Sequence, residues 1–250
     1  MKNRLLLLSA ALAAALPSFA AEVRLNGAST TVNGLINPAK ANVETATGFT
    51  LKVAGTNTGK GLVALAQGQC DASLTSEPLD IAYGAGQIAA KLAGVELAPE
   101  SEYQLHEVKQ DTVVWVVHPS NPVDSLTHEQ IKAIHTGQIT NWKEVGGLDQ
   151  PIVVFTDAVT GGTRALVRKL ALDGSDYSTA CKPLESVRFV AAQVAELRNG
   201  FGGVGAGFVD PTKVKILKAP AVPRPLGFIT KGAPTPEVRK VIEAYRVAAH

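Results

Sequence analysis

Three short segments of this chain combine glycine with serine or threonine where a β-forming run gives way to a helix-like pattern. They are NGASTTV at 26–32, AGTNTGKG at 54–61 and TGGTR at 160–164. Free backbone N–H groups at a helix start, with the positive end of the helix dipole, suit a bound anion. Glycine lets the backbone approach closely, and hydroxyl groups donate further hydrogen bonds. Each segment alone is more often an ordinary cap, so they indicate an anion site only if the fold brings them together.

The charged residues near these segments give a mixed signal. Asp157 places a fixed negative charge just ahead of the third segment, whereas Lys60 and Arg164 lie within the second and third. Either cation could supply positive charge to an anion or pair with Asp157. Arg164 is also typical of a structural ion pair at a helix start. The sequence leaves open whether Asp157 faces the site or points away.

Motifs for catalysis, metal binding and nucleotide binding are missing from the sequence. It has no GxxxxGK[ST] loop and no GxSxG motif, and GFGGVG at 200–205 is not followed by a clear helix. The five histidines show no metal-ligand spacing, and we expect His128 and His135 on one face of an exposed helix. We therefore expect no enzyme activity, no catalytic residue, no metal and no cofactor.

The first twenty residues, MKNRLLLLSAALAAALPSFA, have the features of a secretory signal peptide. A basic start and an apolar run lead to a small-x-small ending at Ser18 and Ala20. We expect cleavage after Ala20 or after Ala21, and no cysteine follows that could carry a lipid. The mature protein is therefore expected to be free in the periplasm or outside the cell.

The overall charge excludes two classes of partner. The chain has 24 basic and 22 acidic residues, and Lys2 and Arg4 belong to the predicted leader. The mature chain is therefore close to neutral and has no basic block. This balance argues against nucleic acid or an anionic membrane surface as a partner, so ligand preference must come from a local site.

Two cysteines, Cys70 and Cys181, would enter an oxidising compartment with the mature chain. They could form a disulfide or remain two buried thiols. Their positions are too far apart in the sequence to decide between these states.

Strand-like and helix-like segments alternate along the chain, which predicts an α/β fold with parallel sheets and ligand sites at the carboxyl ends of strands. The strongest helix signal is 125–138, where Thr127 and Gln130 form a capping box and Gly137 ends the helix. The pattern in segment 103–119 predicts two β-rich runs separated by a polar interruption at Lys109–Asp111.

Several segments together resemble the phosphate-binding proteins of phosphate ABC transporters. The resemblance covers nearly all of the mature chain, in the family's order, and its most specific part is ITNWKEVGG. The segments are GASTTV at 27–32, GTNTGKGLVAL at 55–65, DASLTSEPL at 71–79, HPSNPVDSLTHEQIKAIHTGQITNWKEVGG at 118–147 and RPLGFITKGAPTPEVRKVIEAYR at 224–246.

This resemblance implies a two-lobed periplasmic-binding-protein (Venus-flytrap) fold with two hinge crossovers. Lobe one would contain residues 21–109 and 209–250, and lobe two residues 110–208. The crossovers would lie near Lys109–Thr112 and Gly205–Val209. The resemblance further implies a periplasmic monomer that delivers phosphate or another small solute to an ABC permease in the inner membrane, because lobe closure is the signal such a permease reads.

The resemblance also assigns ligand contacts residue by residue. At two positions this chain departs from the family: Asp157 stands where an arginine commonly neutralises phosphate, and Ser76 stands where many members use a carboxylate to accept the phosphate proton. TGGT replaces the usual GSGT, so one hydroxyl is displaced or lost. The contacts carried over are Thr30, Thr31, Thr58 and Gly59 from lobe one and Gly161, Gly162 and Thr163 from lobe two. Ser76, Asp157 and Arg164 complete the candidate ligand-binding residues.

Three functions remain open at this point. The first is capture of phosphate or a related oxyanion. The second is the same scaffold binding an amine-bearing or neutral solute, which the change from arginine to Asp157 would favour. The third is an extracellular sensor or interaction protein without a transport role. If Asp157 faces the cleft, each unit of charge is worth up to about 4 kcal/mol at a few ångströms and an effective dielectric near 20.

Overall fold

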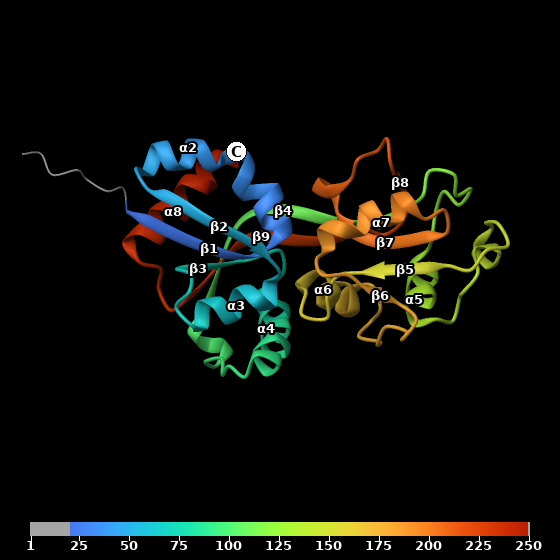
Figure 1. Ribbon diagram of the computed structural model, residues 1–250, viewed down its shortest axis with the longest axis horizontal. Helices are drawn as coiled ribbons and strands as arrows, with labels where there is room; N and C mark the ends of the chain where they lie inside the picture. Colours follow the sequence, from blue (N-terminus) through green and yellow to red (C-terminus); the bar gives the residue numbers. More distant parts are fainter. Residues whose placement is uncertain (1–20, 250) are drawn as a thin grey trace, which may run out of the picture.

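Two lobes joined by a pair of long strands make up the computed structural model, which describes residues 21–249 (Figure 1). This arrangement confirms the predicted α/β, two-lobed fold class. The predicted leader, residues 1–20, lies outside the described part.

The first lobe is built on three parallel strands. β1 (Glu22–Ala28) pairs with β2 (Thr50–Thr56) on one side and with β3 (Ala72–Thr75) on the other. Helices α2 (Asn37–Thr47) and α8 (Pro236–Ala248) cover one face of this sheet, and α3 (Thr58–Ala66) and α4 (Leu79–Ala93) cover the other (Figure 1). Apolar side chains of the strands pack against α2 and α8. This core includes Val23, Leu25, Leu51 and Leu74 of the strands, Val43 of α2, and Val241 and Tyr245 of α8.

The second lobe has its own sheet and core. β5 (Val153–Thr156) pairs in parallel with β6 (Lys182–Pro183) and β7 (Gly200–Gly205). The surrounding helices are α5 (His128–Thr136), α6 (Gly162–Leu170) and α7 (Val190–Glu196). Its main core gathers large buried side chains of helices and strands. They include Trp115, Trp142, Ile131, Leu166 and Phe201.

Strands β4 (Tyr103–Val117) and β9 (Val222–Lys231) run side by side between the lobes (Figure 1). They are antiparallel, and β9 pairs with β3 while β4 pairs with β7. The result is one mixed sheet in the order β2-β1-β3-β9-β4-β7-β5-β6, with β8 (Lys215–Ile216) beside β4. The expected parallel pairing is present within each lobe, and β4 and β9 add antiparallel pairs between them.

The two crossovers differ in how well the sequence pattern located them. β4 is one continuous strand in which Lys109–Asp111 pair with β9, so the predicted interruption there is wrong. A register shift lies just before it, between Glu107 and Lys109. β8 pairs with the second-lobe end of β4, and Val214 and Leu217 pack in second-lobe cores. The division of the chain into lobes stays a prediction. These contacts lead us to propose β9 as the return crossover instead of Gly205–Val209.

The predicted helix at 125–138 is present as α5, with the Thr127–Gln130 capping box and a left-handed Gly137 at its end. The expectation for its histidines was wrong in part. His135 is buried among aromatic rings, and its Nδ1 lies 2.7 Å from the Ile131 carbonyl. Burial lowers its pKa to about 4, so the imidazole is neutral.

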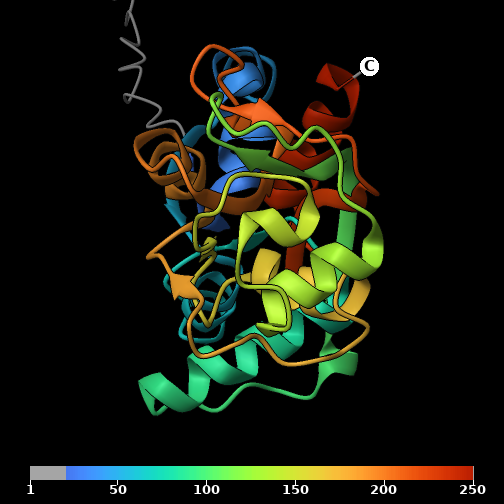
Figure 2. The same cartoon turned by 90° about the vertical axis from the view of Figure 1, so that its right-hand side faces the viewer.

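The two lobes touch along the cleft in this structure. Gly59 N–H donates to the Thr160 carbonyl at 3.2 Å, and Asn57 Nδ2 donates to Thr160 Oγ1 at 3.1 Å. Ser29 Oγ and Ser186 Oγ lie 2.9 Å apart. These hydrogen bonds hold the molecule in a closed arrangement. Figure 2 views it from the second-lobe end, with the first lobe behind.

The other short elements are α1 (Ser29–Thr31), η1 (Val32–Ile36), η2 (Glu100–Glu102), η3 (Trp142–Val145), η4 (Val187–Phe189) and η5 (Ala206–Phe208). None of the helices in residues 21–249 has the length and apolar character needed to cross a membrane.

Candidate functional site

The three glycine- and hydroxyl-rich segments meet at one cavity between the lobes. α1, α3 and α6 begin there, following β1, β2 and β5 respectively. Asn57 caps α3 by accepting a hydrogen bond from Lys60 N–H, and Gly161 is the N-cap residue of α6. The cavity is lined by Ala28, Ser29, Thr30, Asn57, Thr58, Ser76, Glu77, Asp157, Gly162, Thr163, Ser186 and Val187.

This cavity is small and rich in hydrogen-bonding groups. Its volume is about 10 Å³, which is room for roughly one water molecule. A larger ligand therefore requires the lobes to part or lining side chains to move. Most of the lining groups are hydroxyls, carboxylates and helix starts, so a polar ligand suits it best.

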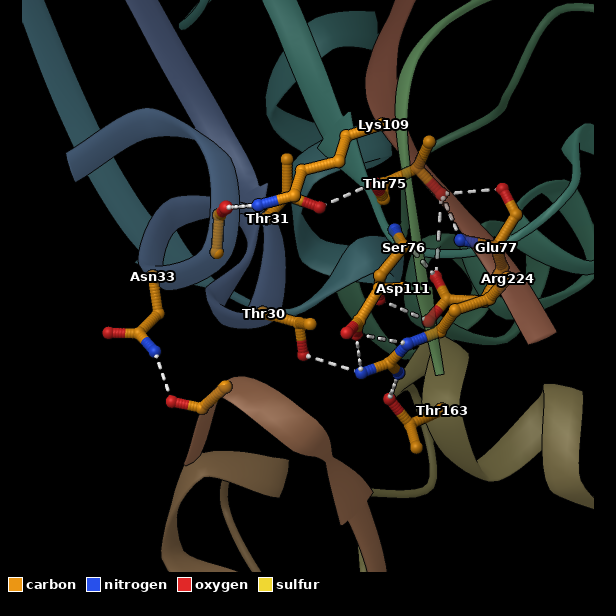
Figure 3. A network of polar contacts seen from close by, with 12 residues as sticks. Thr30, Thr31, Asn33, Thr75, Ser76, Glu77, Lys109, Asp111, Thr163 and Arg224 are labelled. Atoms are coloured by element: carbon orange, nitrogen blue, oxygen red, sulfur yellow. Dashed lines mark hydrogen bonds and ion pairs between the residues drawn. The ribbon is translucent and has the colours of Figure 1, made fainter. Parts of the chain in front are cut away.

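Arg224 is a buried cation beside this cavity, which sequence reasoning did not single out. It is not one of the lining residues, but its guanidinium contacts two of them, Thr30 and Thr163. It lies on β9 opposite Asp111 of β4, and its side chain is fully buried. Its Nε and Nη2 both donate to Asp111 Oδ2, at 3.0 and 2.9 Å. Nη1 donates to Thr163 Oγ1 of the second lobe at 2.9 Å, and Nη2 lies 3.5 Å from Thr30 Oγ1 of the first (Figure 3).

A weak signal for Arg224 does exist in the sequence. Pro223 and Pro225 flank it, and proline cannot donate to a strand ladder, which marks an edge or irregular strand. The resemblance assigned this segment only to a closing strand. The register between β9 and β4, which sets Arg224 against Asp111, comes from pairing across more than a hundred residues.

Glu77 brings a carboxylate into the cavity and corrects the interpretation of Ser76. Its side chain is completely buried and accepts hydrogen bonds from Thr58 Oγ1 at 2.6 Å and Ser76 Oγ at 2.5 Å. The carboxylate thus lies one residue after the position where the family pattern expected it, and Ser76 supports it. A Cβ on Gly162 would overlap this carboxylate, so a larger residue there would displace the Glu77 side chain.

Asp157 faces the cavity and is buried, which answers the question left open by the sequence. Its Oδ1 accepts a hydrogen bond from Ala158 N–H at 2.9 Å. Burial raises its pKa to about 7, and the charge of Glu77 adds to this, while the Ala158 N–H and Arg224 act in the opposite direction. A Cβ on Gly161 would overlap the Asp157 carboxylate, so glycine makes room for it.

Arg164 and Lys60, the two expected cations, do not contribute to this cavity. Arg164 Nη1 donates to Thr156 Oγ1, and its guanidinium lies 4.0 Å from the centre of the Tyr177 ring. Lys60 is exposed on the outer side of α3. Within residues 21–249, neither forms an ion pair with Asp157, so that alternative is not seen, and contact of Arg164 with a ligand stays a prediction.

The other predicted contacts divide into two groups. Thr30, Thr58, Gly162 and Thr163 line the cavity, and their contact with a ligand stays a prediction. Thr31 instead donates to the Thr75 carbonyl at 2.5 Å, within the first lobe. Gly59 packs its Cα against the backbone carbonyls of Ala85 and Thr160, so it allows close contact between the lobes.

The carboxylates in and beside the cavity outnumber the cations. Arg224 is already paired with Asp111, which leaves Glu77 and Asp157 without a cation of their own in the described residues. Two buried carboxylates favour a ligand that can donate hydrogen bonds to them. A fully ionised ligand without hydrogens would be repelled.

Cys70 and Cys181 are both free and buried, so the structure contains two buried thiols and no disulfide between them. Burial raises the pKa of the Cys70 thiol to about 11, which makes it unreactive. In residues 21–249, no group of three or more histidine, cysteine, aspartate or glutamate side chains is arranged to hold a metal ion.

This chain is similar in sequence to a family of known proteins. A family model described as "PBP superfamily domain" matches residues 13–222. The phosphate-binding protein PstS of Bacillus subtilis (strain 168) is 31% identical over 117 residues, which is 47% of this chain and 39% of that protein. The match thus spans well under half of the relative's length.

Two solved structures share the fold over most of the chain. A putative phosphate ABC transporter substrate-binding protein with bound phosphate from Clostridium perfringens has a TM-score of 0.75 and 23% identity, over 89% of this chain and 92% of that one. An ABC-type phosphate transport receptor from Vibrio cholerae has a TM-score of 0.62 and 24% identity, over 90% and 93% of the two chains.

Proposed function

The chain belongs to the PBP superfamily, and on that basis we propose that it is a periplasmic solute-binding protein that holds inorganic phosphate between its lobes. The names of its relatives in Bacillus, Clostridium and Vibrio support phosphate as the solute and an ABC transporter as the recipient. We further propose that the mature protein acts as a monomer.

The observation that carries this proposal is the placement of Arg224. A buried guanidinium reaches the starts of α1 and α6 through Thr30 and Thr163, one from each lobe. A tetrahedral oxyanion in this position would receive hydrogen bonds from the guanidinium, from hydroxyls and from backbone N–H groups of both lobes. Binding would therefore favour the closed arrangement.

The two carboxylates then restrict which oxyanion binds. Glu77 and Asp157 need hydrogen-bond donors on the ligand, and phosphate at neutral pH carries protons, whereas sulfate does not. Asp157 with a pKa near 7 can also hold a proton itself and donate it to a phosphate oxygen. We therefore expect phosphate to be preferred over sulfate, and its binding to weaken as the pH rises through about 7.

Calorimetry on the protein without its predicted leader, unfolded and refolded to remove bound ligand, tests this proposal. Phosphate and sulfate are titrated separately at pH 6 and pH 8. We expect micromolar or tighter phosphate binding and no heat with sulfate at the same concentrations. Absence of heat with millimolar phosphate at both pH values would rule out the phosphate assignment.

The pair Glu77 and Asp157 also supports a second candidate, a solute that carries an amine. An ammonium group donates up to three hydrogen bonds and would neutralise buried carboxylates without needing their protonation. A screen of small amines in the same calorimeter separates the two cases. An amine ligand should bind more tightly as the pH rises through about 7, which is opposite to the expectation for phosphate.

The genes that neighbour this one test whether the protein delivers its solute to an inner-membrane permease. Genes for a permease and an ATPase beside this gene would support transport, and their absence would favour a sensor role. Size-exclusion chromatography with and without phosphate tests the monomer.

A further inference from the structure

A second, larger cavity lies between the lobes and is bordered by a later part of α6 than the candidate site. Its volume is about 660 Å³, whereas the Arg224 site encloses about 10 Å³. We call it the inter-lobe groove, formed by α4 of the first lobe and by α6 and the loop at 174–177 of the second. Volumes of this size at a domain interface are typical of sites for small organic molecules.

The groove has an apolar side that both lobes provide. Ile81, Ala85 and Ile88 come from α4, and Val159 and Ala165 face them from the second lobe. Ile88 and Val159 are about half exposed, at 48% and 52%, which leaves apolar surface uncovered on both rims. An apolar ligand body would cover this surface and remove it from water.

Gly84 leaves the α4 wall of the groove open. A Cβ built on Gly84 would meet no atom within 4 Å. A larger side chain at this position would therefore extend into the groove without displacing protein atoms. This property makes Gly84 a suitable place to block the groove.

The charged side of the groove has more basic side chains than carboxylates. Lys169 pairs with Asp80 across the lobes, and Arg168 pairs with Asp176 at 2.9 Å. Arg164 has no carboxylate partner among residues 21–249, since its described contacts are Thr156 Oγ1 and the Tyr177 ring. One cation thus remains available to an anionic group in the groove.

We propose that the inter-lobe groove binds a small organic anion, with its charged head at Arg164 and its apolar body against Ile88 and Val159. A carboxylate and a phosphate monoester share this chemistry, because arginine binds both through paired N–H donors. The site is separate from the Arg224 cavity and does not depend on the identity of the solute held there.

A ligand in the groove would contact both lobes at once. A groove ligand would therefore stabilise the closed arrangement and raise the affinity of the Arg224 site for its solute. Solute at the Arg224 site would raise the affinity of the groove for its ligand by the same factor. The Lys169–Asp80 ion pair links the two lobes, so it also stabilises the closed arrangement.

Titration with sodium hexanoate and with hexyl phosphate, each followed by NMR and calorimetry, tests the proposal, and hexylammonium serves as the charge control. We expect millimolar or tighter binding of at least one anion and none of hexylammonium. Gly84→Leu and Val159→Asp should each weaken this binding at least tenfold. Gln87→Leu, on the exposed face of the same helix, should leave it unchanged.

The outcomes separate this site from the first one. Hexanoate should bind without competing with inorganic phosphate, and saturating phosphate should raise the affinity for hexanoate. Binding of neither anion up to roughly 10 mM, or equal binding by wild type and Gly84→Leu, would overturn the proposal. Competition with phosphate would also overturn it, because the anion would then occupy the Arg224 cavity.

Discussion

Asp111 and Arg224 face each other on β4 and β9, the two strands that join the lobes, and share two hydrogen bonds of 3.0 and 2.9 Å. The pair fixes the guanidinium at the hinge, where Nη1 and Nη2 point to hydroxyls of opposite lobes (Figure 3). This position differs from the family pattern, in which the loop before α6 commonly supplies the arginine.

Arg224→Gln should lower phosphate affinity at least 100-fold, because the buried cation is lost while Glu77 and Asp157 remain. Losing one partner of a buried, hydrogen-bonded charge pair typically costs about 2–5 kcal/mol. Calorimetry measures the change. Arg239→Gln, on the exposed face of α8, is the control and should bind as wild type does. Equal loss in both variants would show that the effect is not specific to the hinge.

Asp157→Asn should stabilise the ligand-free protein at neutral and alkaline pH. The folded-state pKa of Asp157 is about 7 and lies above its ordinary value of 3.8. The contribution of Asp157 to the free energy of unfolding is therefore greatest below about pH 4 and falls as the pH rises to about 7. The advantage of the variant should grow by roughly 2–3 kcal/mol between pH 5 and pH 8. Urea unfolding at both pH values measures it.

The control for this prediction is Asp176→Asn, whose side chain is 87% exposed. Its stability should follow that of wild type at both pH values. A pH profile of Asp157→Asn parallel to wild type would mean that Asp157 keeps an ordinary pKa and is hydrated in solution.

Glu77→Gln should reduce the preference for phosphate over sulfate by at least tenfold. The carboxylate can only accept a hydrogen bond, whereas the glutamine amide can also donate one to a sulfate oxygen. Competition of the two anions at pH 7 measures the ratio of their affinities. Glu237→Gln at the exposed start of α8 should leave the ratio unchanged. An unchanged ratio in Glu77→Gln would remove Glu77 from the ligand contacts.

Gly205→Ala should weaken phosphate binding while the protein still folds. A Cβ at this position would overlap Arg224 Nη2 and crowd Thr30 Cγ2, which lies 3.2 Å away. The guanidinium would have to leave Thr30 or Asp111. Gly207→Ala is the matched control, since its Cβ would find an ordinary contact of 3.5 Å with Asn33. Calorimetry on both variants checks this, and equal binding would contradict the placement of Arg224.

The sequence by itself determined the elements and the local chemistry of the helix starts. The α5 capping box and the glycine–hydroxyl segments depend on residues three or four apart, so spacing alone could predict them. The resemblance supplied the two-lobed fold and the order of its segments. Thr30, Thr58, Gly162 and Thr163 were placed at the cleft by that combination.

Tertiary structure alone decided which charges meet at the cavity. Arg224 reaches Asp111 through the register of two strands more than a hundred residues apart, and no local spacing encodes that register. Ser76 and Glu77 both line the cavity after β3, and Ser76 donates a hydrogen bond to the Glu77 carboxylate. Burial then raises the pKa of Asp157, and burial is a property of the packed fold.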